Sequence, residues 1–80
     1  MKEASLDVLG MYCQEAGLSH GELWLRYFEL GGMSAGFELE GILCGVLAPS
    51  AYDHDIIALA INERLVELGV QPAIPYLLEP

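Results

Sequence analysis

Residues 19–32 read SHGELWLRYFELGG, and this stretch contains a helix start, an apolar helix body and a helix stop. Ser19 and Glu22 have the S-x-x-E spacing of a capping box, in which two side chains satisfy backbone N–H groups at a helix N-terminus. The two glycines that close the stretch suit the left-handed backbone that often ends a helix. The stretch therefore predicts a helix over residues 20–30.

Similar signals predict three more helices. Apolar residues follow a helical period up to Gly17, and Ser34 and Ser50 each precede another periodic run as candidate N-caps. Residues 70–80 contain three prolines and are expected to be extended. The apolar side chains of this segment are expected either to pack back on the domain or to reach a partner, and they are Ile74, Tyr76, Leu77 and Leu78. The expected helices cover residues 3–16, 20–30, 35–47 and 51–68. The sequence thus predicts an all-α, compact four-helix domain with an extended proline-containing C-terminal tail, forming a single domain over residues 1–80.

Composition separates this chain from several classes of protein. It has 80 residues, 54% of them hydrophobic, and a net charge of −9 from 12 acidic and 3 basic residues. A disordered acidic tail would be poor in apolar residues, so we expect the chain to fold. Direct nucleic-acid binding is not expected, because it depends on basic side chains that neutralise phosphates. No apolar run approaches the ~18 residues of a spanning helix, and we expect a cytoplasmic protein without membrane contact.

Glycine and cysteine positions lead to two packing predictions. Gly41 and Gly45 are four residues apart in the expected third helix, where they would form a smooth strip for close contact with another helix. Interior glycines cost a helix about 1 kcal/mol each relative to alanine, so a packing reason is expected. Cys13 and Cys44 have no second cysteine close in sequence, and both are expected to be small core residues.

Candidate chemistry is limited to two histidines near acids or cysteines. Asp53, His54 and Asp55 are consecutive, and adjacent helical residues point about 100° apart, so they cannot converge on one metal ion. His20 could approach a cysteine, but nothing in the spacing favours a nucleophile pair. The chain has no Gly-rich phosphate loop and no paired metal motif. We therefore predict a protein that is not an enzyme, with no catalytic residues, no cofactor and no metal.

Two expected helices have apolar faces that a single neighbouring helix cannot cover. Residues 20–30 carry three aromatic side chains and leave only a narrow polar stripe. Residues 51–68 have two apolar stripes, which either a central position in the bundle or a seam with a homodimer or protein partner would explain. The predicted partner-binding residues are Trp24, Tyr27, Phe28, Tyr52, Leu59 and Val66, with Glu63 and Glu67 as an acidic rim.

Three stretches of the chain carry a family resemblance. They are ELWLRYFELGG at residues 22–32, ELEGIL at residues 38–43, and His54 and Asp55 followed by INERL at residues 61–65. In these stretches the chain resembles a group of small actinobacterial helical proteins of unassigned function. The resemblance implies a soluble bacterial helical protein with a regulatory role, and it supplies no catalytic residues.

Three functions are compatible with these patterns. The favoured one is a small acidic protein–protein interaction module, regulatory and self-associating, whose acidic rim steers it to a basic partner surface. The first alternative is an acidic DNA mimic or anti-activator that blocks a transcription component, although the acidic residues are dispersed over three helices. The second alternative is a sensor of small apolar ligands, with a pocket between the glycines of the third helix and the aromatic residues of the second.

Overall fold

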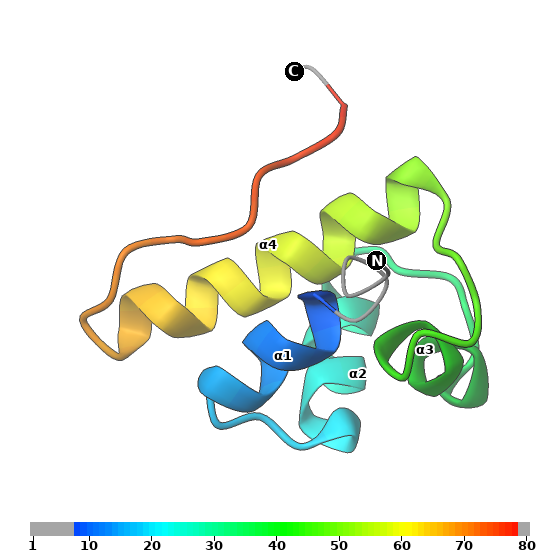
Figure 1. Ribbon diagram of the computed structural model, residues 1–80, viewed down its shortest axis with the longest axis horizontal. Coiled ribbons are helices and arrows are strands. Elements are labelled where there is room, and N and C mark those ends of the chain that lie inside the picture. The colour runs from blue at the N-terminus through cyan, green and yellow to red at the C-terminus, as the bar shows by residue number, and fades with distance from the viewer. Residues whose placement is uncertain (1–7, 79–80) are drawn as a thin grey trace, which may run out of the picture.

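The computed structural model describes residues 8–78, which form four helices. Short turns join them, as Figure 1 shows. The helices are α1 (Val8–Glu15), α2 (His20–Glu29), α3 (Gly36–Leu43) and α4 (Ala51–Glu67). The prediction of an all-α four-helix fold is confirmed. Residues 3–7 of the predicted first helix lie outside the described part of the chain. Residues 70–78 follow α4 without helix or strand, and this segment is called the strap below.

The longest helix, α4, occupies the centre of the structure. It packs against α1 and α2, and the strap runs back along another side of it (Figure 1). The main apolar stripe predicted for this helix consists of Ile57, Ile61, Leu65 and Leu68. The first three are buried, whereas Leu68, just beyond the end of α4, is 47% exposed. The strap contributes Ile74 to the same core. The helices and the strap thus cover α4 on two sides. Most of the apolar surface of α4 is therefore buried within the chain itself, without a partner.

The local signals at the start of α2 form the bonds that their spacing predicts. The Ser19 backbone N–H donates to Glu22 Oε1 at 2.8 Å, and the Glu22 N–H donates to Ser19 Oγ at 3.1 Å. These hydrogen bonds favour the charged carboxylate and hold the pKa of Glu22 below its ordinary value. Gly31 has a φ of +105°, which lets the chain leave the helix sharply.

Tyr27 connects α2 to the α2–α3 turn and to α4. Its hydroxyl donates to Asp53 Oδ1 at 2.8 Å and accepts from the Ser34 N–H at 2.8 Å. The Ser34 hydroxyl also donates to Asp53, at 3.2 Å. The aromatic ring lies against Gly32, where any Cβ would overlap it. Ser34 is therefore not the N-cap of α3 as predicted; Ala35 holds that position, and its N–H donates to the Glu38 side chain.

The prediction that the third helix continues to residue 47 is wrong. α3 ends at Leu43 because Gly45 has a φ of +82°, a left-handed conformation that terminates the helix. The chain then turns back, and the Leu47 N–H donates to the Gly41 carbonyl at 3.0 Å. A Cβ on Gly41 would lie 2.8 Å from the Leu47 side chain. The two glycines therefore make a tight helix end and do not form a smooth strip.

Close helix contact is made instead by a glycine in α1. Gly10 lies so near the Leu43 carbonyl of α3 that an added Cβ would overlap it. This contact lets α1 and α3 approach closely, with Leu9 and Cys13 of α1 buried. Cys44, one residue beyond α3, is exposed, so its prediction as a core residue is wrong, whereas the prediction for Cys13 is confirmed.

Candidate interaction groove

A groove lies between the outer face of α4 and the strap. Its volume is about 450 Å³. Its walls are Leu59, Asn62, Glu63, Val66 and Glu67 of α4, with Pro72 and Tyr76 of the strap. The α4 residues are three, four, seven and eight positions apart, so they form one helical face of about 12 Å. The space between this face and the strap is called the α4–strap groove below.

Asn62 holds the strap against α4. Its side-chain oxygen accepts from the N–H groups of Ala73 (2.9 Å) and Ile74 (3.0 Å). Its Nδ2 donates to the Ile74 carbonyl at 2.8 Å and to the Tyr76 hydroxyl at 3.2 Å. A primary amide has two donors and two acceptor sites, so the strap satisfies the whole side chain. This accounts for an asparagine that is only 4% exposed.

Asp55, two turns before Asn62 on α4, holds the end of the strap. Its carboxylate accepts from the Leu77 N–H at 2.7 Å and from the Leu78 N–H at 2.9 Å. His54 Nδ1 lies 3.0 Å from the same carboxylate. The bond from Leu77, with smaller contributions from His54 and Leu78, lowers the pKa of Asp55 despite opposing desolvation. Asn62 and Asp55 together are called the strap clamp below.

The acidic rim of the groove has two chemically different carboxylates. Glu67 accepts from Arg26 at 3.0 and 2.9 Å and from Arg64 at 3.2 Å. The bond from Arg26, and then the bond from Arg64, lowers the pKa of Glu67. Glu63 is exposed and forms no ion pair within residues 8–78. The negative charge available to a ligand at this rim is therefore that of Glu63.

The residues predicted to bind a partner fall into three groups. Leu59 and Val66 line the groove, and Val66 is 56% exposed. Trp24 and Phe28 stack on each other elsewhere, on α2, with ring centroids 5.2 Å apart. The two remaining residues do not belong to either surface.

Tyr27 and Tyr52 both use their hydroxyl groups in contacts within the domain. Tyr27 is fully buried, so its prediction as a partner-binding residue is wrong. The error has a physical reason: the polar network around its hydroxyl directs this aromatic inward, and helical spacing does not encode that network. Tyr52 is exposed, but its hydroxyl donates to the Gly31 carbonyl at 2.7 Å and joins α4 to the end of α2.

Sequence reasoning missed the residues that build the second wall of the groove. Pro72 and Tyr76 come from the strap. This segment was expected to be extended, with Tyr76 either packing back or reaching a partner, and its docking on α4 was not predicted. Asn62 was also missed, although a signal was present. Asn62 directly follows Ile61, which belongs to the buried apolar stripe of α4. A neutral polar side chain buried at such a position needs several hydrogen-bond partners. The sequence could not show that the strap supplies them.

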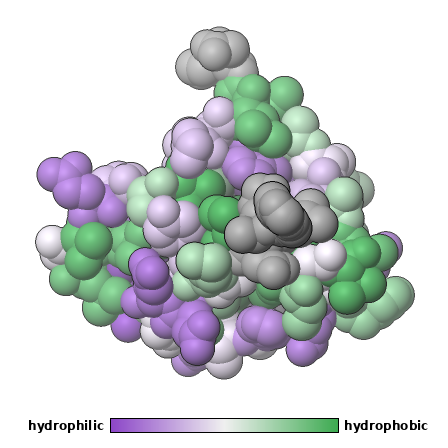
Figure 2. Space-filling view, in the orientation of Figure 1, coloured by the Kyte–Doolittle hydropathy of each residue, from purple (hydrophilic) through white to green (hydrophobic). Residues whose placement is uncertain are grey.

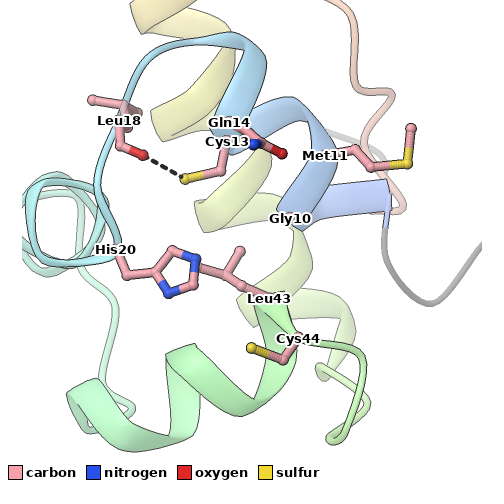
Figure 3. A pocket seen from close by; sticks show the side chains of 8 residues that line it. All are labelled: Gly10, Met11, Cys13, Gln14, Leu18, His20, Leu43 and Cys44. Atoms are coloured by element: carbon pink, nitrogen blue, oxygen red, sulfur yellow. Dashed lines mark hydrogen bonds between the residues drawn. The ribbon is translucent and has the colours of Figure 1, made fainter.

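A second pocket brings together His20, Cys13 and Cys44, as Figure 3 shows. Its volume is about 560 Å³, and it lies between α1 and α3. The Cys13 thiol donates to the Leu18 carbonyl at 3.4 Å, and burial raises its pKa. His20 Nδ1 lies 3.2 Å from Glu40 Oε2. Because Cys13 is held as a neutral thiol and His20 is paired with Glu40, this geometry is not that of an activated thiolate.

A smaller pocket lies between α2 and α3, where the sensor hypothesis placed one. It measures about 230 Å³, and its lining residues are His20, Gly21, Trp24, Gly36 and Glu40. Trp24 is the only aromatic among them, and its Nε1–H donates to the Ser34 carbonyl at 3.2 Å. At about 230 Å³, this pocket is smaller than the roughly 300–1,000 Å³ of a typical small-molecule site, and a histidine and a carboxylate lie at its edge.

Comparison of the chain with protein-family models, curated proteins and solved structures found no match. The resemblance noted in the sequence therefore stays a prediction. Within residues 8–78, no helix has both the length and the apolar character required to cross a membrane. The same residues contain no group of three His, Cys, Asp or Glu side chains arranged to hold a metal ion. Asp53 and Asp55 make separate contacts, with Tyr27 and with the strap.

Proposed function

We propose that this protein is an acidic protein–protein interaction module that binds a basic, apolar segment of its partner in the α4–strap groove. One observation carries the proposal. The groove combines apolar walls with Glu63, an exposed carboxylate that has no ion pair within the described residues. Four of the predicted surface residues, Leu59, Val66, Glu63 and Glu67, line it.

The spacing of the groove residues favours a helical ligand. Leu59 and Val66 are seven residues apart on one face of α4, with Glu63 between them, which is the arrangement of a helix-packing surface. An amphipathic helix could place an apolar side chain between Leu59, Val66 and the strap. A lysine or arginine one turn away on that helix would then approach Glu63. The matching partner is a short amphipathic helix with basic residues beside its apolar face.

The net charge favours a basic partner at this groove, and the rim charge of Glu63 disfavours a second copy docked on the same surface. The chain carries a net charge of −9. A symmetric dimer through the groove would bring the Glu63 side chains of two copies close together, and like charges across an interface oppose association. A basic partner is attracted both by the rim and by the whole molecule, which raises the rate of encounter.

The DNA-mimic alternative has less support. Mimicry of a phosphate backbone needs rows of carboxylates whose charge is not already neutralised. Glu67 is bound by both Arg26 and Arg64, which removes one of the two predicted rim charges from such a row. The sensor alternative likewise has only the small polar-edged pocket beside Trp24 in its favour.

The proposal is tested with a synthetic amphipathic helix made of leucine and lysine. A peptide of the same pattern with glutamate in place of lysine serves for comparison. Binding is measured by isothermal titration calorimetry at two salt concentrations. We expect the lysine peptide to bind more tightly, with an affinity that falls as salt is added. Equal binding of the two peptides would contradict the proposed charge recognition.

Two variants locate the binding surface. Val66→Ser removes apolar wall, and Val46→Ser is its matched control because Val46 is 78% exposed and lies outside the groove. Glu63→Gln removes the rim charge, and its control is Glu29→Gln, which changes an exposed acid of α2. An exposed charge contributes about 0.2–1 kcal/mol, so Glu63→Gln should weaken binding about 1.5- to 5-fold. Equal losses in the variants and their controls would place the binding surface elsewhere.

A further inference from the structure

The strap is bound to α4 in the way a protein binds an extended peptide. The strap clamp forms six hydrogen bonds with the strap. Five of them are with main-chain groups, and the sixth is with the Tyr76 hydroxyl. Main-chain N–H and C=O groups are present in any extended segment. Only Ile74 enters the core as a side-chain anchor, with 4% of its surface exposed. The strap clamp therefore recognises an extended backbone with one apolar anchor.

The strap is well suited to act as a separable ligand. Residues 70–78 contain no charged side chain, so placing this segment on another copy adds no charge repulsion at the strap clamp. Pro72 and Pro75 restrict the backbone to extended conformations, which lowers the entropy lost on docking. The strap thus resembles a preordered peptide that is covalently joined to its own binding site.

The connection between α4 and the strap offers a hinge. Gly69 has a φ of +83°, and the Val70 N–H closes the helix by donating to the Leu65 carbonyl at 2.8 Å. Within residues 8–78, no hydrogen bond ties the side chains or backbone of Gln71 or Pro72 to the domain. Both residues are exposed. Everything that fastens the strap lies beyond this short connection, so a change there would redirect the whole segment.

We propose that the strap clamp is a peptide-binding site that the strap of a second copy occupies in trans, which produces a dimer by exchange of residues 70–78. The second copy would form the same hydrogen bonds and bury the same Ile74. The strap also exposes hydrophobic side chains: Val70, Tyr76, Leu77 and Leu78 are each about half exposed, at 52%, 49%, 61% and 53%. Figure 2 shows hydrophobic surface on the strap near the top of the view. Two exchanged straps can cover part of this surface.

Concentration decides between the two forms. A strap joined to its own domain by a short connection has an effective concentration in the millimolar range, so the self-docked form prevails in dilute solution. Exchange is favoured when the self-docked contact is impaired or when the protein is concentrated. The strap clamp shares Asn62 with the α4–strap groove but does not include Glu63, on whose charge the proposed function relies. Glu63→Gln can therefore weaken peptide binding without affecting exchange, and exchange can fail while charge recognition persists.

Mixing two full-length variants tests exchange without competition from the self-docked strap. Ile74→Asp spoils the strap and leaves the strap clamp intact; Asn62→Ala spoils the strap clamp and leaves the strap intact. The strap of the second variant then has its best site on the first variant. Light scattering coupled to size-exclusion chromatography gives the mass at a concentration well below the millimolar range. Each variant alone should have the 8.7 kDa mass of one chain, and the mixture should contain a species of twice that mass.

In the control, Val70→Asp takes the place of Ile74→Asp and adds the same charge at an exposed position of the strap. A mixture of Val70→Asp with Asn62→Ala should stay monomeric, because the strap of Val70→Asp still fills its own strap clamp. Circular dichroism establishes that each variant keeps its helices. If both folded variants stay monomeric when mixed, exchange is overturned.

A second measurement applies if Asn62→Ala fails to fold. A synthetic peptide of residues 70–78 is titrated into full-length Ile74→Asp and followed by the backbone NMR signals of α4. Saturable shifts around Asn62 and Asp55 would support occupation in trans. No shift at peptide concentrations above the millimolar range would contradict it.

Discussion

Asn62→Ala is expected to release the strap while leaving the helices folded. The substitution removes four hydrogen bonds, each with a net contribution of about 1 kcal/mol. Their sum is an upper limit, because a released strap recovers hydrogen bonds to water. Release exposes Ile74 in the parent protein and in the variant alike, so the burial of this side chain does not enter the difference between them. If each lost bond costs about 0.5 kcal/mol, the lower end of its range, the loss of strap docking free energy is about 2 kcal/mol.

Hydrogen exchange of the Leu77 amide measures this release. Leu77 bonds to Asp55 and not to Asn62, so a faster exchange there reports movement of the whole strap. A loss of about 2 kcal/mol corresponds to roughly 30-fold faster exchange. The control is Gln71→Ala, which changes an exposed residue of the strap and should leave this rate unchanged. Amides in the centre of α2 and α3 serve as internal references.

Two results would refute the reasoning. If Leu77 exchanges at the same rate in Asn62→Ala, the asparagine does not hold the strap. If the reference amides of α2 and α3 accelerate as much as Leu77, Asn62 supports the whole domain and the strap is not an independent unit.

Three further predictions concern other parts of the molecule. Gly32→Ala should destabilise the fold by about 1–3 kcal/mol in urea unfolding, because the new Cβ overlaps the Tyr27 ring, whereas Gly21→Ala meets no atom within 4 Å and should be neutral or stabilising. The lowered pKa of Asp55 means that its stabilisation of the strap is complete above its unfolded pKa, near 4, and is lost as pH falls through the lower folded pKa. Strap amide exchange should therefore accelerate on acidification, and less so in Asp55→Asn. The exposed Cys44 thiol should react with a thiol reagent in the native protein, whereas the buried cysteine should react only after unfolding.

Clear outcomes would contradict each of these expectations. Equal stability of Gly32→Ala and Gly21→Ala would mean that the ring is free to move. A strap whose exchange has the same pH dependence with and without Asp55 would remove the carboxylate from strap docking. Reaction of both cysteines at the same rate in the native state would contradict the burial of Cys13.

Much of the helical framework was predictable because helix starts depend on close neighbours in sequence. Ser19 and Glu22 bond across three residues, and Ser50 accepts from the Asp53 N–H in the same way, at 3.0 Å. These bonds follow from spacing alone. The end of α3 was predicted less well. From the sequence, Gly45 could either continue the helix or end it. The helix ends there because Gly45 has a positive φ and the chain turns back, so that the Leu47 side chain lies against Gly41.

The candidate site was predictable only on its α4 side. Leu59, Val66 and the two acids of the rim follow from helical periodicity, since residues seven apart share a face. The strap wall depends on contacts between residues 11 to 23 positions apart, as in the bonds from Asn62 to Ala73 and from Asp55 to Leu78. Sequence spacing does not specify how an extended segment docks on a helix, because many registers satisfy the same backbone groups.

The sequence by itself determined the all-α class, the starts of α2 and α4, the acidic surface and the apolar stripes of α4, because short-range hydrogen bonding and side-chain period express these properties directly. Only the tertiary structure decided which apolar residues stay exposed and available to a partner. Tyr27 turned inward because Ser34 and Asp53 surround its hydroxyl. The strap covers Asn62 because its backbone and the Tyr76 hydroxyl satisfy the buried amide. Burial of a polar group depends on partners distant in the chain, and packing is what brings those partners together.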